Sequence, residues 1–152
     1  MSVEAFLSYL SLEKNYSPHT VTAYRSDISD FKMFCSESYD VSNIDDVSYN
    51  LVRSWIVRLV NDSISNRTIN RKIASLKAYY KFLQRIEKIE VNPLAKHRAL
   101  KTSKKIEVPF SEAEMQAVIN QINFEEGFVG SRDKLIIELL YTTGIRRAEL
   151  IN

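Results

Sequence analysis

Glycine is almost absent from this chain of 152 residues, and that scarcity restricts the fold more than any other feature. There are three glycines and three prolines, and no glycine occurs before Gly127. Tight β-hairpin turns depend on residues that tolerate positive φ angles, which glycine does best, and no alternation of strand and helix patterns is visible. The sequence therefore predicts an all-α fold.

Apolar side chains recur with a helical period in four segments, which are residues 3–12, 18–37, 48–60 and 66–86. Ser17 has the side chain of an N-cap, and Pro18 suits the first helical position. Four such helices can enclose one core, in which we place Cys35 and Trp55. The core face of the fourth helix is predicted to hold Ile69, Ile73, Leu76, Tyr80, Leu83 and Ile86. We interpret the adjacent acids Asp45 and Asp46 as solvated loop charges.

The helical pattern fails between residues 87 and 110, where Asn92-Pro93 precedes a run of basic residues. This change predicts a first domain over residues 1–92, a basic linker over 93–110, and the start of a second domain over 111–152.

In the predicted second domain, Ser111 and Glu114 have the spacing of a capping box that opens a fifth helix. Ser131 or Asp133 is expected to cap a sixth helix. Gly144 stands where a left-handed residue would end that sixth helix.

The formal net charge of +2 conceals a strong asymmetry along the chain. Residues 1–46 contain 3 basic and 8 acidic side chains, whereas residues 47–110 contain 14 basic and 4 acidic ones. Residues 111–152 are acidic again, with 4 basic and 7 acidic side chains. The positive charge is therefore concentrated in the middle, where a polyanion can be bound.

One face of the fourth helix carries most of this charge. At 100° per residue, with Ile69 at zero, an arc from about 80° to 200° holds basic, amide and alanine side chains and no acid. Its members are Arg67, Asn70, Arg71, Ala74, Lys77, Ala78, Lys81 and Arg85. We interpret the arc as projecting from the core and contacting DNA, since alanines permit close approach to a phosphate backbone. A merely solvated face is the alternative.

Two further groups are candidates for DNA contact. His19, Thr20 and Arg25 follow the Ser17-Pro18 start, where helix N-terminal amides favour phosphate oxygens. A solvent-facing His19 and a capping role for Thr20 are the alternatives. Lysines of the linker complete the set, namely Lys101, Lys104 and Lys105.

Arg146 follows Gly144 at a turn between two helical patterns. An arginine on such an elbow, with backbone N–H groups beside it, can bind a phosphate through two parallel hydrogen bonds. An ordinary surface turn is the alternative.

Other kinds of site find little support. The chain has two histidines and one cysteine, without an H-E-x-x-H or C-x-x-C pattern, so no metal site is expected. No basic N-terminal region and no apolar run of ~18 residues is present, so we expect a cytoplasmic protein without a membrane segment.

Three motifs resemble those of tyrosine recombinases and phage-type integrases, in family order and spacing. They are S-P-H-T-V-T-A-Y-R-S-D-I from Ser17, N-R-K-I-A-S-L-K-A-Y-Y-K-F-L from Asn70, and T-G-I-R-R-A-E-L from Thr143. The resemblance implies a SAM-like four-helix core-binding domain, a basic linker and the first helices of a catalytic domain. It also implies that Arg146 is the first of two arginines on the scissile phosphate, that Glu149 supports the elbow, and that Arg147 is variable.

For a complete enzyme, the resemblance implies DNA strand exchange through a 3′-phosphotyrosyl intermediate without any cofactor. Its partners would be double-stranded DNA and further copies of the chain, as a dimer or tetramer. The remaining catalytic groups would lie beyond Asn152, so this chain is expected to be inactive alone. A stand-alone DNA-binding protein and a helical adaptor for an acidic protein partner stay open as alternatives.

Overall fold

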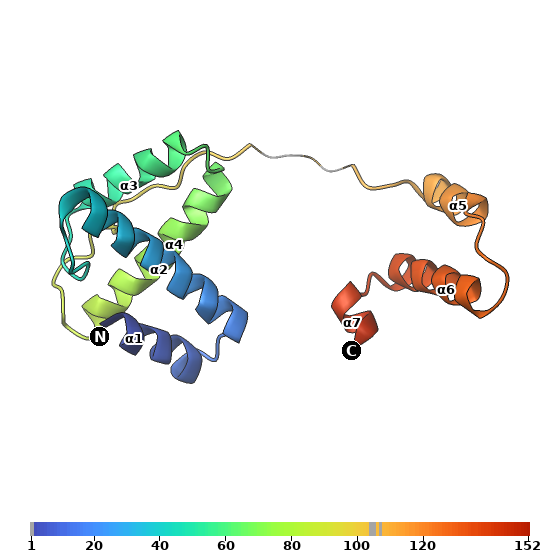
Figure 1. Ribbon diagram of the computed structural model, residues 1–152, viewed down its shortest axis with the longest axis horizontal. Helices are drawn as coiled ribbons and strands as arrows, with labels where there is room; N and C mark the ends of the chain where they lie inside the picture. The colour runs from blue at the N-terminus through green and yellow to red at the C-terminus, as the bar shows by residue number, and fades with distance from the viewer. Residues whose placement is uncertain (1, 104–105, 107) are drawn as a thin grey trace. The chain divides into compact units, whose positions relative to one another are not determined.

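The computed structural model describes residues 2–103, 106 and 108–152. Two compact units divide the chain, residues 1–103 and residues 104–152 (Figure 1). The division falls inside the predicted linker, and residues 93–103 belong to the first unit. Every regular element among the described residues is helical, which confirms the all-α class. None of the helices in these ranges is long and apolar enough to cross a membrane.

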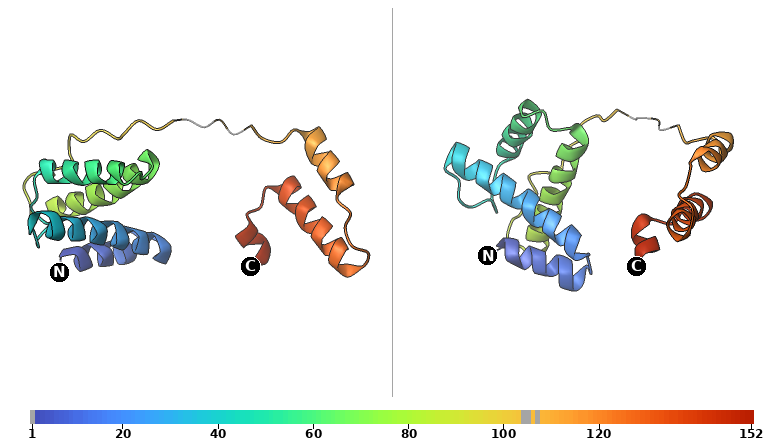
Figure 2. Two further views of the ribbon diagram at one scale, coloured as in Figure 1. Left: turned by 45° about the horizontal axis from the view of Figure 1, so that its top comes forward. Right: turned by 45° about the vertical axis from the view of Figure 1, so that its right-hand side comes forward.

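The first unit is built from four helical segments. Helix α1 (Ser2–Ser8) runs into a π-helical turn (Tyr9–Glu13) and is followed by α2 (Pro18–Tyr39), α3 (Tyr49–Asn61) and α4 (Asn66–Arg85). Helix α4 contacts each of the other three. Figures 1 and 2 show α2 and α4 crossing in the middle, with α1 and α3 on opposite sides. The core therefore forms around α4.

Side-chain caps fix the starts of α2 and α4. The hydroxyl of Ser17 accepts a hydrogen bond from the backbone N–H of Thr20, and Pro18 occupies the first helical position, as predicted. Ser65 accepts the equivalent bond from Thr68 at the start of α4. These bonds satisfy backbone donors that have no partner within the helix.

The predicted core face of α4 is mostly correct. Five of its six members are buried, and the exception is Ile86, the C-cap residue after the helix, which is 48% exposed. Tyr79 and Phe82 are also buried, since α4 is covered on more than one side. Cys35 and Trp55 lie in the core as predicted.

Asp45 corrects the interpretation of the two loop acids. Its side chain is buried and accepts hydrogen bonds from the hydroxyls of Ser2 and Tyr79, and it pairs with the ammonium of Lys88. Asp46 is exposed, as predicted. A turn in the loop brings only the first of the pair inward, where three donors compensate its charge.

The second unit contains α5 (Glu112–Gln121), α6 (Phe128–Thr143) and α7 (Arg147–Ile151). Ser111 and Glu114 form the predicted capping box. The expected cap of α6 at Ser131 or Asp133 is wrong, because this helix begins at Phe128 after Gly127, whose φ is 99°. Gly144 ends α6 in the left-handed conformation, with φ of 65°, as predicted.

Candidate nucleic-acid interface

The basic face of α4 is largely exposed in the structure. The side chains of Arg67, Lys77 and Lys81 are exposed, and none of the three makes an ion pair with another described residue. Ala74 is exposed and Ala78 is half-buried between them. The arc thus presents long cationic side chains around short ones, on the side of α4 away from its core.

Arg71 departs from the expectation that it projects freely. Its guanidinium makes two hydrogen bonds to Asp27 on α2, at 2.6 Å and 2.9 Å. In the projection Arg71 lies at about 200°, next to buried Ser75 at about 240°, so its side chain can reach across to α2. Arg71 is therefore an interhelical contact as well as a member of the basic arc.

Asn70 ties α4 to the segment that follows the helix bundle. Its side-chain amide donates to the carbonyl of Leu100 and accepts from the N–H of Leu100, both at 2.9 Å. Asn66 donates to the carbonyl of Lys101. This part of the predicted linker is consequently held against the start of α4, with the Lys101 side chain exposed. Lys104 and Lys105, the other two linker candidates, lie outside the described residues.

The start of α2 supplies the other predicted contacts. His19 is exposed, and the hydroxyl of Thr20 lies 2.9 Å from that of Ser17, within the cap. Arg25 is exposed but donates two hydrogen bonds to the carboxylate of Glu4, at 2.7 Å and 3.2 Å. Solvent screens such an exposed pair, so it restrains Arg25 without removing it from the surface.

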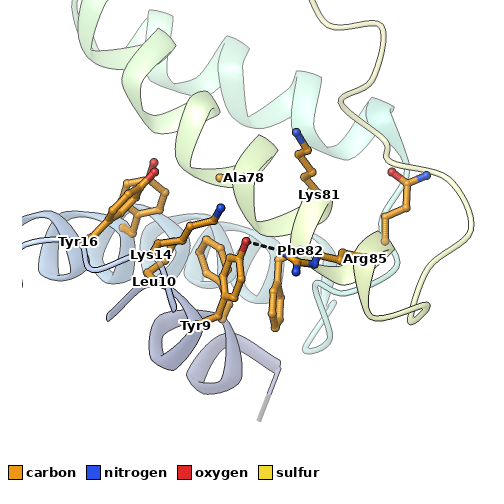
Figure 3. A pocket seen from close by; sticks show the side chains of 11 residues that line it. Tyr9, Leu10, Lys14, Tyr16, Ala78, Lys81, Phe82 and Arg85 are labelled. Atoms are coloured by element: carbon orange, nitrogen blue, oxygen red, sulfur yellow. Dashed lines mark hydrogen bonds between the residues drawn. The ribbon is translucent and has the colours of Figure 1, made fainter. Parts of the chain in front are cut away.

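A pocket of about 580 Å³ opens beside the C-terminal half of α4 (Figure 3). Arg85 donates to the hydroxyl of Tyr9 at 2.9 Å, and its guanidinium lies 5.5 Å from the centre of that ring. The ammonium of Lys14 lies 5.7 Å from the same ring, and Lys81 also lines the pocket. Cations from α4 and from the end of the π-helical turn therefore gather around one aromatic side chain.

Three side chains of this surface were not predicted from the sequence. Lys14 lies in the acidic segment 1–46, and Asp27 and Lys72 were assigned no role, although each stands within one of the quoted motifs. Lys72 pairs with Asp27 at 3.3 Å and with Asp30 at 2.6 Å. The missing information was the pairing of α2 with α4, which a local pattern does not contain.

Arg146 occupies the N-cap position of α7, and its side chain is 83% exposed. Its backbone N–H donates to one oxygen of Glu149 at 2.9 Å, and its guanidinium donates to the other at 3.0 Å. Glu149 therefore bonds to both the backbone and the side chain of Arg146. Arg147 is exposed as the first residue of α7.

The described residues contain no cluster of three or more His, Cys, Asp or Glu side chains that could hold a metal ion. Burial raises the pKa of the Cys35 thiol to about 11, which keeps it protonated and unreactive at neutral pH.

Comparison with known proteins agrees with this arrangement. The family model of the phage integrase N-terminal SAM-like domain matches residues 3–87. Tyrosine recombinase XerC of Oceanobacillus iheyensis is 36% identical over 99% of this chain and 48% of the relative. The corresponding protein of Anoxybacillus flavithermus is 37% identical over 99% of this chain and 50% of the relative. The tyrosine recombinase XerC of Staphylococcus aureus is 31% identical over 98% of this chain and 49% of the relative.

The chain spans about half the length of the curated relatives it matches. No solved structure matches it significantly. The family match covers α1 to α4, and the relatives extend the similarity through the turn that contains Arg146. The chain therefore belongs to the family of phage integrases and Xer-like tyrosine recombinases, and residues 3–87 are its N-terminal SAM-like domain.

Proposed function

We propose that this chain is the DNA-binding portion of a site-specific tyrosine recombinase. The observation that carries the proposal is the largely exposed basic face of α4 within a domain of the integrase family. Double-stranded DNA carries a phosphate charge every ~1.7 Å along its axis, so a row of exposed cations on one helix can neutralise several phosphates at once. The division into a core-binding domain, a basic linker and the start of a catalytic domain, and assembly as a dimer or tetramer on DNA, belong to the same proposal.

The first unit offers two surfaces that a duplex can contact. The α4 arc presents Arg67, Lys77 and Lys81, and the exposed His19 and Arg25 lie near the start of α2. Backbone phosphates would position the duplex, because these side chains lack a set of paired acceptors and donors for reading bases. We therefore infer weak binding with little sequence preference for the first unit alone.

Salt titration tests the DNA-binding proposal. With about five phosphate contacts, the logarithm of the association constant should fall against the logarithm of salt concentration with a slope near −4 to −5. Fluorescence anisotropy of a labelled duplex with the 152-residue chain measures this slope. A slope near zero would favour the alternative of a helical adaptor for an acidic protein.

Matched variants locate the contact surface. Lys77→Ala should reduce the magnitude of the slope by about 1, because one phosphate contact is lost. Arg53 is an exposed cation on α3, outside both proposed surfaces, and Arg53→Ala should leave the slope unchanged. Equal effects of the two substitutions would place the DNA elsewhere on the domain.

For the complete protein, we propose strand exchange through a 3′-phosphotyrosyl intermediate, with Arg146 binding the scissile phosphate. The support is its exposed guanidinium at a helix start, held by Glu149 at both the backbone and the side chain. Negative charge that develops on the phosphate during cleavage would be stabilised by this preorganised cation.

The two neighbouring arginines allow a sharp test in the complete protein. Arg146→Ala should reduce formation of the covalent DNA adduct by about 10²–10³-fold, as expected for one preorganised charge stabiliser. Arg147→Ala should reduce it much less. Denaturing gels of a nicked substrate measure the adduct for both variants and the wild type. Equal losses would assign the phosphate contact to another residue, and an absence of adduct from the wild type would favour a non-catalytic DNA-binding protein.

A further inference from the structure

Asp27 is a buried acidic residue that contacts Arg71, a member of the α4 surface that we propose to bind DNA. It lies on α2, is 1% exposed, and accepts hydrogen bonds from four donors of α4. Arg71 donates twice, at 2.6 Å and 2.9 Å, the hydroxyl of Ser75 donates at 2.7 Å, and the ammonium of Lys72 at 3.3 Å. Both carboxylate oxygens are therefore fully engaged, so Asp27 can bind no further ligand.

The two cations around Asp27 differ in their surroundings. The side chain of Lys72 is only 13% exposed and also pairs with Asp30, so its ammonium is shared between two carboxylates. The side chain of Arg71 is 51% exposed and pairs with Asp27 alone among the described residues. Lys72 thus compensates buried charge, whereas Arg71 stands between the buried carboxylate and solvent.

The remaining donors of Arg71 have no acceptor among the described residues. A guanidinium has five N–H donors, and two of them bond to Asp27. The two parallel bonds fix the plane of the group, so the other donors are held in a constant direction. Arg71 also belongs to the α4 arc with Arg67 and Lys77. A rigid cation in that arc loses less conformational freedom when it binds an anion than a mobile one does.

We propose that Asp27 is a positioning residue for DNA, which acts by holding Arg71 in the orientation that donates to a backbone phosphate. This inference rests on the proposed DNA-binding function and names one contact within it. The positioning role predicts a change in DNA affinity opposite in sign to the change that simple electrostatics predicts. Removal of a negative charge near bound DNA should strengthen binding if only the long-range field matters, whereas loss of a positioning residue weakens it.

A double-mutant cycle tests the proposal with the 152-residue chain and a labelled duplex. Asp27→Asn keeps the shape of the side chain but removes the charge that holds the guanidinium. We expect it to weaken DNA binding about tenfold, which is within the range for one well-oriented charged contact. In the Arg71→Ala background, Asp27→Asn should cause no further loss, because the residue it positions is already absent.

Asp30→Asn is the matched control. It removes the same charge from the same helix, but the half-exposed Asp30 pairs, among the residues that the structure describes, with Lys72 and not with Arg71. Its DNA affinity should be unchanged or slightly higher. Circular dichroism measures the concentration of folded protein for each variant. A smaller folded fraction is then not mistaken for weaker DNA binding. If Asp27→Asn lowers the DNA affinity equally in the wild-type and Arg71→Ala backgrounds, its effect is on the structure of the domain, and the proposal is overturned.

Arg71→Lys covers the case in which Asp27→Asn does not fold. Lysine keeps the charge and one ion pair to Asp27 but lacks the second parallel bond. We expect about the same tenfold loss, and wild-type affinity in this variant would overturn the proposal. The experiment separates failure of the DNA-binding function from failure of the positioning role. If the wild type shows no salt-dependent DNA binding, the proposed function fails. If salt-dependent binding is unchanged in Asp27→Asn and Arg71→Lys, only the positioning role fails.

Discussion

The carboxylate of Asp45 joins three distant parts of the first unit. It accepts a hydrogen bond from Ser2 at the start of α1, another from Tyr79 on α4, and an ion pair from Lys88 after α4 at 2.6 Å. Burial acts to raise the pKa of Asp45, but these hydrogen bonds and the charge of Lys88 outweigh it, and the pKa is lowered below its ordinary value of 3.8. The folded state therefore favours the ionised form.

This shift predicts how stability depends on pH. Because the folded pKa is lower than the unfolded one, the Asp45 contribution is complete above about pH 4 and is lost as pH falls through the folded pKa. Asp45→Asn should lower the free energy of unfolding at pH 7 by about 2–3 kcal/mol and flatten its decline in acid. Urea titrations across this range measure both effects. The exposed neighbour provides the control, since Asp46→Asn should change neither, and equal effects would refute the assigned role of Asp45.

Helix α4 shows which elements the sequence could predict. Its apolar period is a local property, and the predicted start and most core residues are correct. The width of its buried face was underestimated, because α1, α2 and α3 all contact the helix. Tyr79 and Phe82 consequently lie in the core although they fall outside the apolar stripe. A single-sequence period cannot report how many neighbours a helix has.

In the candidate site too, properties of a single helix were predictable from the sequence, whereas contacts between elements were not. The exposed cations of α4 were predicted from its helical projection, because exposure there depends on one helix alone. The pairing of Asp27 with Arg71 joins residues 44 positions apart, and that of Tyr79 with Asp45 joins residues 34 apart. Such contacts depend on how α2 and the following loop pack on α4. Their charges were visible in the sequence, but their partners were not.

At the scale of the whole molecule, the first unit extends beyond its last helix. Leu94 is fully buried in its core, and His97 lies against Tyr49 of α3, with 3.2 Å between the hydroxyl and Nδ1. Burial and the nearby charge of Lys77 lower the pKa of His97, which favours the neutral form of its ring. The bonds of Asn70 to Leu100 continue this attachment. Residues 93–103 thus pack as part of the unit, although the sequence assigned them to a linker.

The position of this boundary can be measured by truncation. A fragment of residues 1–103 keeps Leu94 and both bonds to Leu100, whereas a fragment of residues 1–92 exposes the site that Leu94 fills. The shorter fragment should be less stable by about 2–5 kcal/mol, the range for deleting a buried leucine side chain. Urea unfolding followed by circular dichroism measures the difference. Leu94→Ala within the longer fragment should reproduce most of the loss if core packing is the cause. Equal stability of the two fragments would instead support a domain that ends at residue 92 and a linker that only rests on its surface.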